Sequence, residues 1–306
     1  MLKIEYYLPE QKLRNADLVK LYPEWTEDKI LSKTGIASRH VVEAGSGSLE
    51  LAVGACRKLF AAGVEASQID FILFCTQSPK YRLPSTACLL QDRLGISKTV
   101  GALDFDLGCS GFVYGLALAK GLVKGGIASN VLLVTAETYT KYIGEFDKST
   151  RTIFGDGAAA TLIDERAVAS IGEFVLGTDG GGAEKLILRD GENLFMDGPE
   201  IFNFTLDVVP KTIEEVCEKN GIKRDEVDLF VFHQANKFML DTIRKVNFLP
   251  RDKFYVNLED TGNTVSSTIP IALKRAEDDG KLKAGMKIMI VGFGVGLSWG
   301  GTILQY

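Results

Sequence analysis

A cysteine near the middle of the chain has the surroundings of a reactive thiol. Cys109 lies in the run 104–112, which leaves an apolar strand and enters a small-residue helix that we expect over 110–124. A thiol at this junction faces the free N–H groups of the first helical turn, whose partial positive charge favours thiolate over thiol. Gly108 and Gly111 flank the cysteine and allow a ligand to approach closely. We therefore expect Cys109 to be a nucleophile of lowered pKa, and the sequence around Ser110 does not match the serine-nucleophile pattern G-x-S-x-G.

Two further polar residues follow in the second half of the chain. His233 ends the apolar run 227–232, and the polar residues after it indicate an accessible imidazole. Asn263 lies in the loop Thr-Gly-Asn-Thr at 261–264, where it could be only a turn residue. Beside a histidine, its amide could instead donate a hydrogen bond to a developing enolate oxygen. Cysteine, histidine and asparagine at three strand ends suggest acyl chemistry through a thioester.

A glycine-rich stretch near the C-terminus invites a dinucleotide-loop interpretation. It runs over 292–300 as GFGVGLSWG, and only six residues follow it. No helix can begin there to hold a pyrophosphate. We expect a tight turn between two strands, with its amide groups facing the catalytic centre.

The composition excludes several classes of protein. The chain has 306 residues, of which 46% are hydrophobic and 25% charged, and its formal net charge is −5. This acidic balance argues against a nucleic-acid partner. No run of apolar residues is long enough for a membrane span, and the N-terminus lacks the pattern of a signal peptide. We expect a cytoplasmic protein without a membrane partner.

The five cysteines form no metal or disulfide pattern. None has C-x-x-C spacing, and with only two histidines the chain has no zinc-ligand spacing, so we expect no metal site. Apart from Cys109, we interpret the cysteines as buried packing thiols in a reducing compartment: Cys56, Cys75, Cys88 and Cys217. We interpret His40, the other histidine, as a structural or surface residue.

The chain also repeats itself. Residues 66–75 (ASQIDFILFC) read like residues 224–233 (RDEVDLFVFH), and each copy follows an amphipathic helix that ends in glycine, over 49–63 and 208–221. Strands that alternate with helices predict parallel sheets covered on both faces. We predict an α/β fold of two duplicated halves, 1–164 with the cysteine and 165–306 with the histidine and asparagine. The likeliest mobile loops lie at 142–151 and 177–182.

At this point the motifs are similar to those of a known family. The chain resembles the β-ketoacyl-acyl-carrier-protein synthases of class III, which are condensing enzymes of the thiolase superfamily. The resemblance runs nearly end to end through short motifs: Lys33–Ile36, Pro84–Cys88, Asp106–Phe112, Phe154–Gly157, Met196–Gly198, His233–Asn236, Gly262–Thr264 and Gly292–Gly300. It implies a five-layered α-β-α-β-α thiolase-like fold, a homodimer and a catalytic triad of Cys109, His233 and Asn263.

The resemblance implies a two-step reaction without a cofactor. The cysteine takes an acyl group from acyl-CoA or an acyl carrier protein, and then condenses it with malonyl-carrier-protein, with loss of carbon dioxide. It also implies an oxyanion hole formed by the backbone N–H groups of Cys109 and Val295. Three residues match acyl-pocket positions, the first of them reaching across from the partner subunit: Leu83, Phe202 and Phe293. Seven match positions that bind the donor or its pantetheine arm: Lys29, Lys33, Lys148, Phe154, Met196, Gly198 and Asn236.

The chain departs from the family where the donor and the carrier bind. Lys29 and Lys148 stand where the family often has a tryptophan and an arginine around an adenine ring. Lysines can hold phosphates but cannot stack in the same way. Phe238 stands in place of an arginine implicated in carrier docking, and Lys237, Arg244 and Lys245 could supply the basic patch. Our hypothesis is therefore that the chemistry is retained while donor recognition has moved.

Two rival interpretations are open. One is acyl transfer to an alcohol or amine without condensation, which the retained Asn263 disfavours. The other is a non-catalytic partner that only binds acyl groups.

Overall fold

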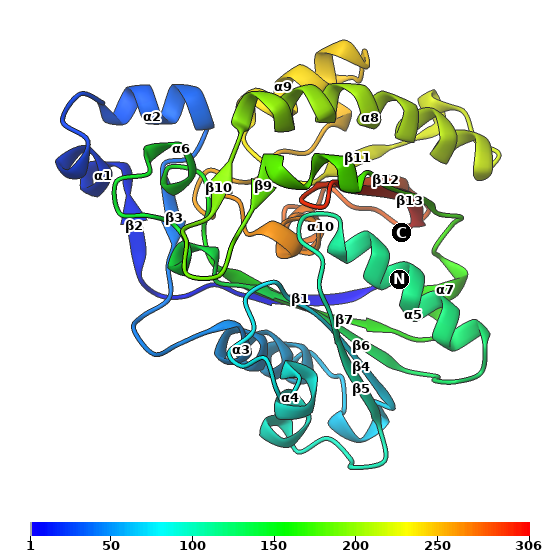
Figure 1. Ribbon diagram of the computed structural model, residues 1–306. Helices are drawn as coiled ribbons and strands as arrows, with labels where there is room; N and C mark the ends of the chain where they lie inside the picture. Colours follow the sequence, from blue (N-terminus) through cyan, green and yellow to red (C-terminus); the bar gives the residue numbers. More distant parts are fainter. Residues whose placement is uncertain (1) are drawn as a thin grey trace.

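Two large β-sheets and three layers of helices alternate through the molecule (Figure 1), and two further sheets have two strands each. The computed structural model describes residues 2–306. The first sheet has five strands, in the order β1 (Lys3–Tyr7), β7 (Gly157–Ile163), β6 (Val131–Glu137), β4 (Phe71–Cys75) and β5 (Gly101–Phe105). The second has four, in the order β11 (Leu229–Phe232), β12 (Lys287–Gly294), β13 (Ser298–Gln305) and β8 (Val175–Thr178).

Helices cover both outer faces and fill the space between the sheets (Figure 1). The outer face of the first sheet packs against α3 (Ser48–Ala61) and α4 (Thr86–Leu94). The outer face of the second packs against α8 (Gly198–Lys219), beside which lies α9 (Lys237–Val246). Between the sheets lie α5 (Gly111–Lys124) and α10 (Thr268–Asp278). The predicted α-β-α-β-α architecture is confirmed.

The central helix α5 can lie close to both sheets because its sequence combines large apolar and very small residues. Phe112, Val113 and Leu116 are fully buried between the sheets. A Cβ on Gly115 would stand 2.5 Å from the side chain of Leu133 on β6, so only glycine permits this approach. The helix carries the candidate nucleophile at its N-terminal end.

The prediction of parallel sheets is wrong in part, because both sheets are mixed. β4 pairs in parallel with β5 and β6, and β11 pairs in parallel with β12. The pairs β1–β7, β6–β7, β12–β13 and β13–β8 are antiparallel. Only three residues connect β12 to β13, and so short a connection joins antiparallel neighbours. The tight turn that the glycine-rich stretch predicts is this connection.

The internal repeat is visible in the order of elements. A short 3-10 turn precedes β4 at Ala66–Gln68, and another precedes β11 at Arg224–Glu226. In the part of the chain that forms the first sheet, α5 follows β5. In the part that forms the second sheet, α10 precedes β12. All strands of the first sheet lie within residues 3–163 and all strands of the second within 175–305. The division at 164/165 remains a prediction.

Three local predictions need correction. The helix expected over 208–221 begins ten residues earlier, at Gly198, because Asp197 caps it and Pro199 occupies its first turn, while Pro210 lies within it. The predicted loop 142–151 ends in a helical turn, α6 (Lys148–Arg151), capped by Asp147. Cys88 is exposed rather than buried, because it lies on the outer side of α4.

A small lobe adjoins the two sheets at the left of Figure 1. It contains β2 (Lys12–Arg14), α1 (Asn15–Leu21), α2 (Glu27–Thr34) and β3 (Ser38–His40), with Leu18, Tyr22 and Ile30 as its core. His40 is buried there, with Nδ1 against the carbonyl of Pro9, in keeping with a structural role. The remaining short elements are α7 (Glu165–Ala169), β9 (Leu186–Ile187) and β10 (Phe195–Met196).

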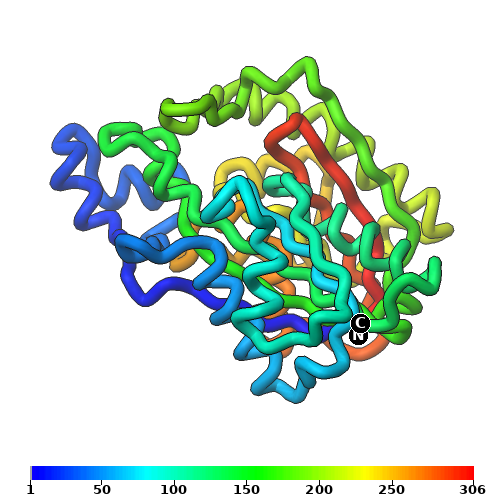
Figure 2. The backbone as a smooth tube through the Cα atoms, turned by 60° about the horizontal axis from the view of Figure 1, so that its bottom comes forward, coloured from blue at the N-terminus to red at the C-terminus, as the bar shows by residue number. Residues whose placement is uncertain are grey.

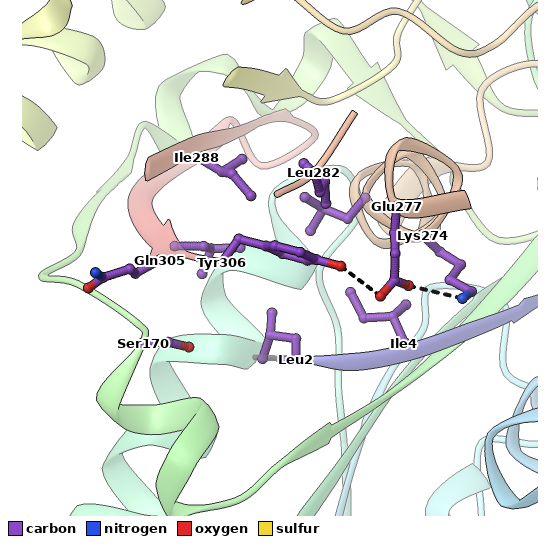
Figure 3. A pocket seen from close by; sticks show the side chains of 11 residues that line it. Leu2, Ile4, Ser170, Lys274, Glu277, Leu282, Ile288, Gln305 and Tyr306 are labelled. Carbon is purple, nitrogen blue, oxygen red and sulfur yellow. Dashed lines mark hydrogen bonds and ion pairs between the residues drawn. The ribbon is translucent and has the colours of Figure 1, made fainter. Parts of the chain in front are cut away.

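The two ends of the chain lie side by side (Figure 2). Leu2 and Tyr306 line one hollow of about 30 Å³ (Figure 3). The Tyr306 hydroxyl donates to Glu277 at 2.8 Å, and Lys274 pairs with Glu277 at 2.9 Å. A space of this size holds one or two water molecules, so the hollow joins the termini and is not a substrate site.

Candidate active site

Cys109, His233 and Asn263 line a single cavity, although up to 154 positions of sequence separate them. The cavity measures about 100 Å³. Its other lining residues are mostly apolar: Ile153, Phe154, Leu186, Met196, Gly198, Ile201, Ala235, Asn236, Met239, Phe293 and Gly294. A thiol, an imidazole and a carboxamide therefore meet in an apolar environment, which strengthens electrostatic interactions.

Two glycines of β12 allow that strand to lie directly against Cys109. A Cβ on Gly294 would stand 3.0 Å from Cys109 Sγ, and one on Gly292 would stand 2.8 Å from the Cys109 carbonyl oxygen. Any larger residue would push the strand away from the thiol. Ser110, the N-cap residue of α5, fixes the other side, because its Oγ lies 2.7 Å from Ser298 Oγ on β13.

The expected lowering of the thiol pKa is wrong. Burial, with a smaller effect from Glu137, raises the pKa of Cys109 to about 12. The side chain is almost completely buried, and the N–H of Gly111 is already donated to the carbonyl of Gly108 at 2.8 Å. The partial charge of a helix terminus does not outweigh the loss of hydration. At rest the Cys109 side chain is therefore a neutral thiol.

His233 follows β11 directly and continues its parallel ladder, since its N–H donates to the carbonyl of Val291 at 2.8 Å. Its ring stands edge-on to Phe293, with centroids 5.4 Å apart. Nδ1 lies 2.7 Å from Thr268 Oγ1. Burial lowers the pKa of His233 to about 3, so the imidazole is neutral. One of its ring nitrogens then donates and the other accepts.

The side chain of Asn263 has a fixed orientation. Its Oδ1 accepts a hydrogen bond from the N–H of Val265 at 2.8 Å, which leaves Nδ2 at 3.4 Å from His233 Nε2. The loop backbone is bound to the segment before β7, because Asn263 N–H donates to the carbonyl of Ile153 and Gly155 N–H donates to that of Asn263. The amide N–H groups of Asn263 are thus available to an oxygen beside the imidazole.

Val295 lies in the turn between β12 and β13. Ser298 Oγ donates to the Val295 carbonyl at 2.7 Å. The Val295 side chain packs against Gly108. Val295 also lines a second cavity of about 270 Å³, which shares Leu186 with the first. This turn brings the Val295 segment next to Gly108, the residue that precedes Cys109.

The three predicted acyl-pocket residues have different positions. Phe293 is buried and lines the catalytic cavity. Phe202 is not among the lining residues, because its ring stacks on Phe238 with centroids 5.4 Å apart. Leu83 is 86% exposed and is not among the residues that line the Cys109 cavity.

The seven predicted donor-binding residues divide into two groups. Phe154, Met196, Gly198 and Asn236 line the catalytic cavity. The three lysines lie on the surface of the small lobe and its neighbour α6. Lys29 Nζ lies 4.9 Å and Lys33 Nζ 5.7 Å from the centroid of the Trp25 ring, while Lys148 pairs with Glu24. A tryptophan is therefore present among these lysines, one helical turn from Lys29.

The predicted docking residues lie on α9, which begins directly after Asn236. Lys237 pairs with Asp241 and packs against Gly35 of the small lobe. Arg244 donates to the carbonyl of Leu249 at 3.2 Å, and it lies with Lys245 in the last turn of the helix. Exposed Phe238 stands at the cavity end of α9.

Comparisons with known proteins agree with this geometry. The family model described as 3-oxoacyl-[acyl-carrier-protein] synthase III matches residues 103–180, and the model of its C-terminal part matches residues 217–306. The β-ketoacyl-[acyl-carrier-protein] synthase III of Caldanaerobacter subterraneus subsp. tengcongensis is 35% identical, with 98% of this chain and 95% of that protein covered.

The chain belongs to the 3-oxoacyl-acyl-carrier-protein synthase III family.

Solved structures of other family members have the same fold. A crystal structure of a 3-oxoacyl-(acyl-carrier-protein) synthase III is 47% identical, has a TM-score of 0.96 and covers 99% of this chain and 98% of its own. The synthase III of Thermus thermophilus is 35% identical, with a TM-score of 0.92 and coverage of 99% and 98%. The predicted thiolase-type fold and condensing-enzyme class are therefore confirmed.

Three residues of this family member were missed by the sequence reasoning. Thr268 contacts the imidazole, Glu137 is buried beneath the site, and the Tyr139 hydroxyl donates to Gln77 Oε1 at 2.5 Å beside the second cavity. Thr268 lies five residues after Asn263, as the first residue of α10, and this spacing is the only signal that could have indicated it. Among residues 2–306, no cluster of three or more potential metal ligands exists and no helix has the length and apolar character to cross a bilayer.

Proposed function

We propose that this synthase III family member joins an acyl group to malonyl-acyl-carrier-protein by decarboxylative condensation, giving a 3-oxoacyl-carrier-protein and carbon dioxide. The observation that carries the proposal is the meeting of Cys109, His233 and Asn263 in one apolar cavity. The products fit the first step of fatty-acid synthesis or a specialised acyl pathway. No cofactor is needed, because the broken and formed bonds are those of thioesters and a malonyl carboxylate.

In the first half-reaction, the Cys109 sulfur attacks the carbonyl carbon of the acyl donor. Since the resting thiol is neutral, its proton passes to His233 Nε2 as the sulfur–carbon bond forms. The donor's carbon–sulfur bond breaks and its sulfur takes the proton. The backbone N–H groups of Cys109 and Val295 are proposed to bind the oxyanion; a backbone donor makes valine as suitable as glycine.

In the second half-reaction, malonyl-carrier-protein loses carbon dioxide and leaves an enolate. Asn263 Nδ2 and His233 Nε2, 3.4 Å apart, can both donate to the enolate oxygen. His233 Nδ1 faces the Thr268 hydroxyl, which donates to the carbonyl of Val265 at 3.1 Å and can rotate to donate to Nδ1 instead. The ring can therefore present either a lone pair or an N–H at Nε2. The enolate carbon attacks the acyl carbon, and the Cys109 sulfur leaves and takes a proton from solvent.

The size of the catalytic cavity supports a short acyl group. An apolar cavity of about 150 Å³ admits benzene, and the space beside the Cys109 sulfur measures about 100 Å³. A longer chain would pass Leu186 into the second cavity. Phe293 is proposed as a wall of the acyl site, and Phe202 supports it only from outside.

The acyl donor is proposed to be acyl-CoA or an acyl carrier protein. Phe154, Met196, Gly198 and Asn236 line the cavity that a pantetheine arm must enter. Lys29, Lys33 and Lys148 are proposed to bind donor phosphates near Trp25. The carrier is proposed to dock on Lys237, Arg244 and Lys245, because carrier proteins are acidic and α9 begins with Lys237 and has Arg244 and Lys245 in its last turn.

A homodimer and a cytoplasmic location are also proposed. β5 is an edge strand of the first sheet and exposes Leu103, and Leu83 is exposed on the connection that precedes α4. A second copy beside β5 would cover both side chains, and Leu83 would then reach the partner's acyl cavity. All five cysteines are free thiols, which is typical of a reducing compartment.

Release of carbon dioxide tests the condensation. Purified protein, an acyl donor and malonyl-carrier-protein should give one carbon dioxide for each 3-oxoacyl product. Acyl transfer to an alcohol or amine without carbon dioxide would contradict the proposal, and a protein that binds acyl groups without turnover would do so as well. The donor is tested separately: fast, saturable acylation of Cys109 by acetyl-CoA would refute the idea that donor recognition has moved.

A further inference from the structure

Glu137 is a buried carboxyl beneath the candidate active site that no step above uses. It is the last residue of β6 and is completely buried. No ion pair found within residues 2–306 includes it. Burial of a carboxyl without a cation costs desolvation free energy, so its hydrogen-bond contacts must stabilise it.

The contacts of Glu137 join both halves of the chain. Its two oxygens accept the backbone N–H of Gln77 at 3.0 and 3.1 Å, and Oε2 accepts the Ser78 hydroxyl at 2.8 Å. From the second half, the Ser266 hydroxyl donates to Oε1 at 3.2 Å. Three donors from two loops thus meet at one carboxyl group.

Each of these loops supports a candidate catalytic residue. Gln77 Nε2 donates to Asp106 at 2.7 Å, and its Oε1 would lie 2.7 Å from a Cβ on Gly108, which directly precedes Cys109. On the other side, Ser266 follows Val265, whose N–H holds the amide of Asn263 and whose φ of 56° lies in the left-handed region that a β-branched residue rarely adopts. Ser266 therefore anchors the strained turn that orients Asn263.

Glu137 also affects the electrostatics of the thiol. Burial is the main cause that raises its own pKa, to about 8, and Asp106 adds to this, while the hydrogen bonds from Ser78, Gln77 and Ser266 lower it. In its ionised form the carboxylate raises the pKa of Cys109. The other titratable groups that interact with it are Asp106, Cys75, Tyr139 and Tyr142.

We propose that Glu137 is a positioning residue that holds the loops of Cys109 and Asn263 in register and whose ionised form makes the Cys109 thiol less reactive. The role in condensation rests on the proposed function; the effect on the thiol does not.

The first test measures the pH dependence of iodoacetamide alkylation at Cys109 by peptide mass spectrometry, without any substrate. The exposed Cys88 is replaced by serine in all proteins compared. Glu137→Gln keeps the shape of the side chain and removes its charge, so the alkylation midpoint should fall by on the order of one pH unit. Asp156→Asn is the matched control, because Asp156 is equally buried but does not affect the pKa of Cys109, and its midpoint should equal that of the parent. An unchanged midpoint in Glu137→Gln would overturn the proposal.

The second test uses Ser266→Ala, which removes one contact and leaves the carboxyl in place. Its condensation rate should fall by about tenfold, as expected when a buried hydrogen bond is lost and its acceptor is left unsatisfied, while acylation of Cys109 changes less. Equal losses in both half-reactions, or no loss, would overturn the positioning role. If the parent protein is not acylated by any donor, the proposed function fails, and the alkylation test still decides the effect of Glu137 on the thiol.

Discussion

Asn263 Nδ2 lies 3.4 Å from His233 Nε2, and both atoms belong to residues that line the cavity of the Cys109 thiol. The Asn263 amide is held by the N–H of Val265, and the imidazole is held by Thr268. The two side chains thus form a pair of fixed polar groups opposite a nucleophile. The predictions below follow from this pair and from the surfaces around it.

Asn263→Ala should separate the two half-reactions. The variant loses one donor to the enolate oxygen, so the condensation rate should fall by about 10²- to 10³-fold. Acylation of Cys109 precedes enolate formation and should remain within a few-fold of the parent rate. Rapid-quench measurement of each half-reaction checks this, and an equal loss in both would show that Asn263 acts only on the structure of the loop.

Thr268→Val should impair catalysis without creating a cavity, since valine has the shape of threonine but no hydroxyl. The buried Nδ1 of His233 would lose its 2.7 Å partner, which leaves a polar atom unsatisfied. We expect kcat to fall about tenfold or more, and Thr268→Ser to restore it. Steady-state kinetics with the 15N spectrum of the imidazole, in a chain with only two histidines, checks both points. A serine variant as impaired as the valine variant would contradict this role.

Stability should decrease in acid because of His233. Burial lowers its folded-state pKa to about 3, whereas the unfolded chain has the ordinary value near 6.5. Between these values the unfolded state binds the extra proton, so stability is lost as the pH falls through this window, by on the order of a few kcal/mol. His233→Gln removes this contribution. Melting temperatures from pH 7 to pH 4 should therefore fall less steeply in the variant than in the parent, and parallel curves would contradict the burial of a neutral imidazole.

Replacement of the basic residues of α9 should weaken binding of the carrier protein without affecting acylation by a small donor. With both Arg244→Glu and Lys245→Glu, KM for malonyl-carrier-protein should rise by about tenfold or more at low salt and the difference should shrink at high salt. Acylation by acyl-CoA should change little. Lys281→Glu together with Lys283→Glu is the control of equal charge change, since both lysines are exposed and precede β12 at the end away from Gly294. An equal effect of this control would show that only net charge matters.

The layers of the fold could be predicted because apolar strands and helices alternate in the sequence. The ends of β4 and β11 could be predicted from the runs 66–75 and 224–233. The start of α5 could be predicted from the small residues near Gly111. The antiparallel strands were missed because a pattern of buried strands does not reveal their direction. The helix predicted over 208–221 begins too late, because α8 starts at Gly198 with Pro199 in its first turn and continues through Pro210.

The candidate site could be predicted in its residue types but not in its electrostatics. Cys109 does precede a helix, yet its pKa is raised, because burial depends on Phe293, Gly294 and other residues that are distant in sequence. Glu137 stands in a run with no recognisable motif, so only its three-dimensional contacts indicate a role. The exposure of Cys88 and the stacking of Phe202 on Phe238 likewise depend on packing between elements.

The central claim, that Cys109 carries the acyl group, is tested most directly by intact-mass analysis after incubation with a panel of acyl-CoA and acyl-carrier-protein donors. We predict that at least one donor adds the mass of a single acyl group, that peptide mapping assigns it to Cys109, and that malonyl-carrier-protein then removes it. Cys109→Ala should remain unmodified. Acylation of another residue such as the exposed Cys88, or of Cys109→Ala to the same extent, would contradict the account.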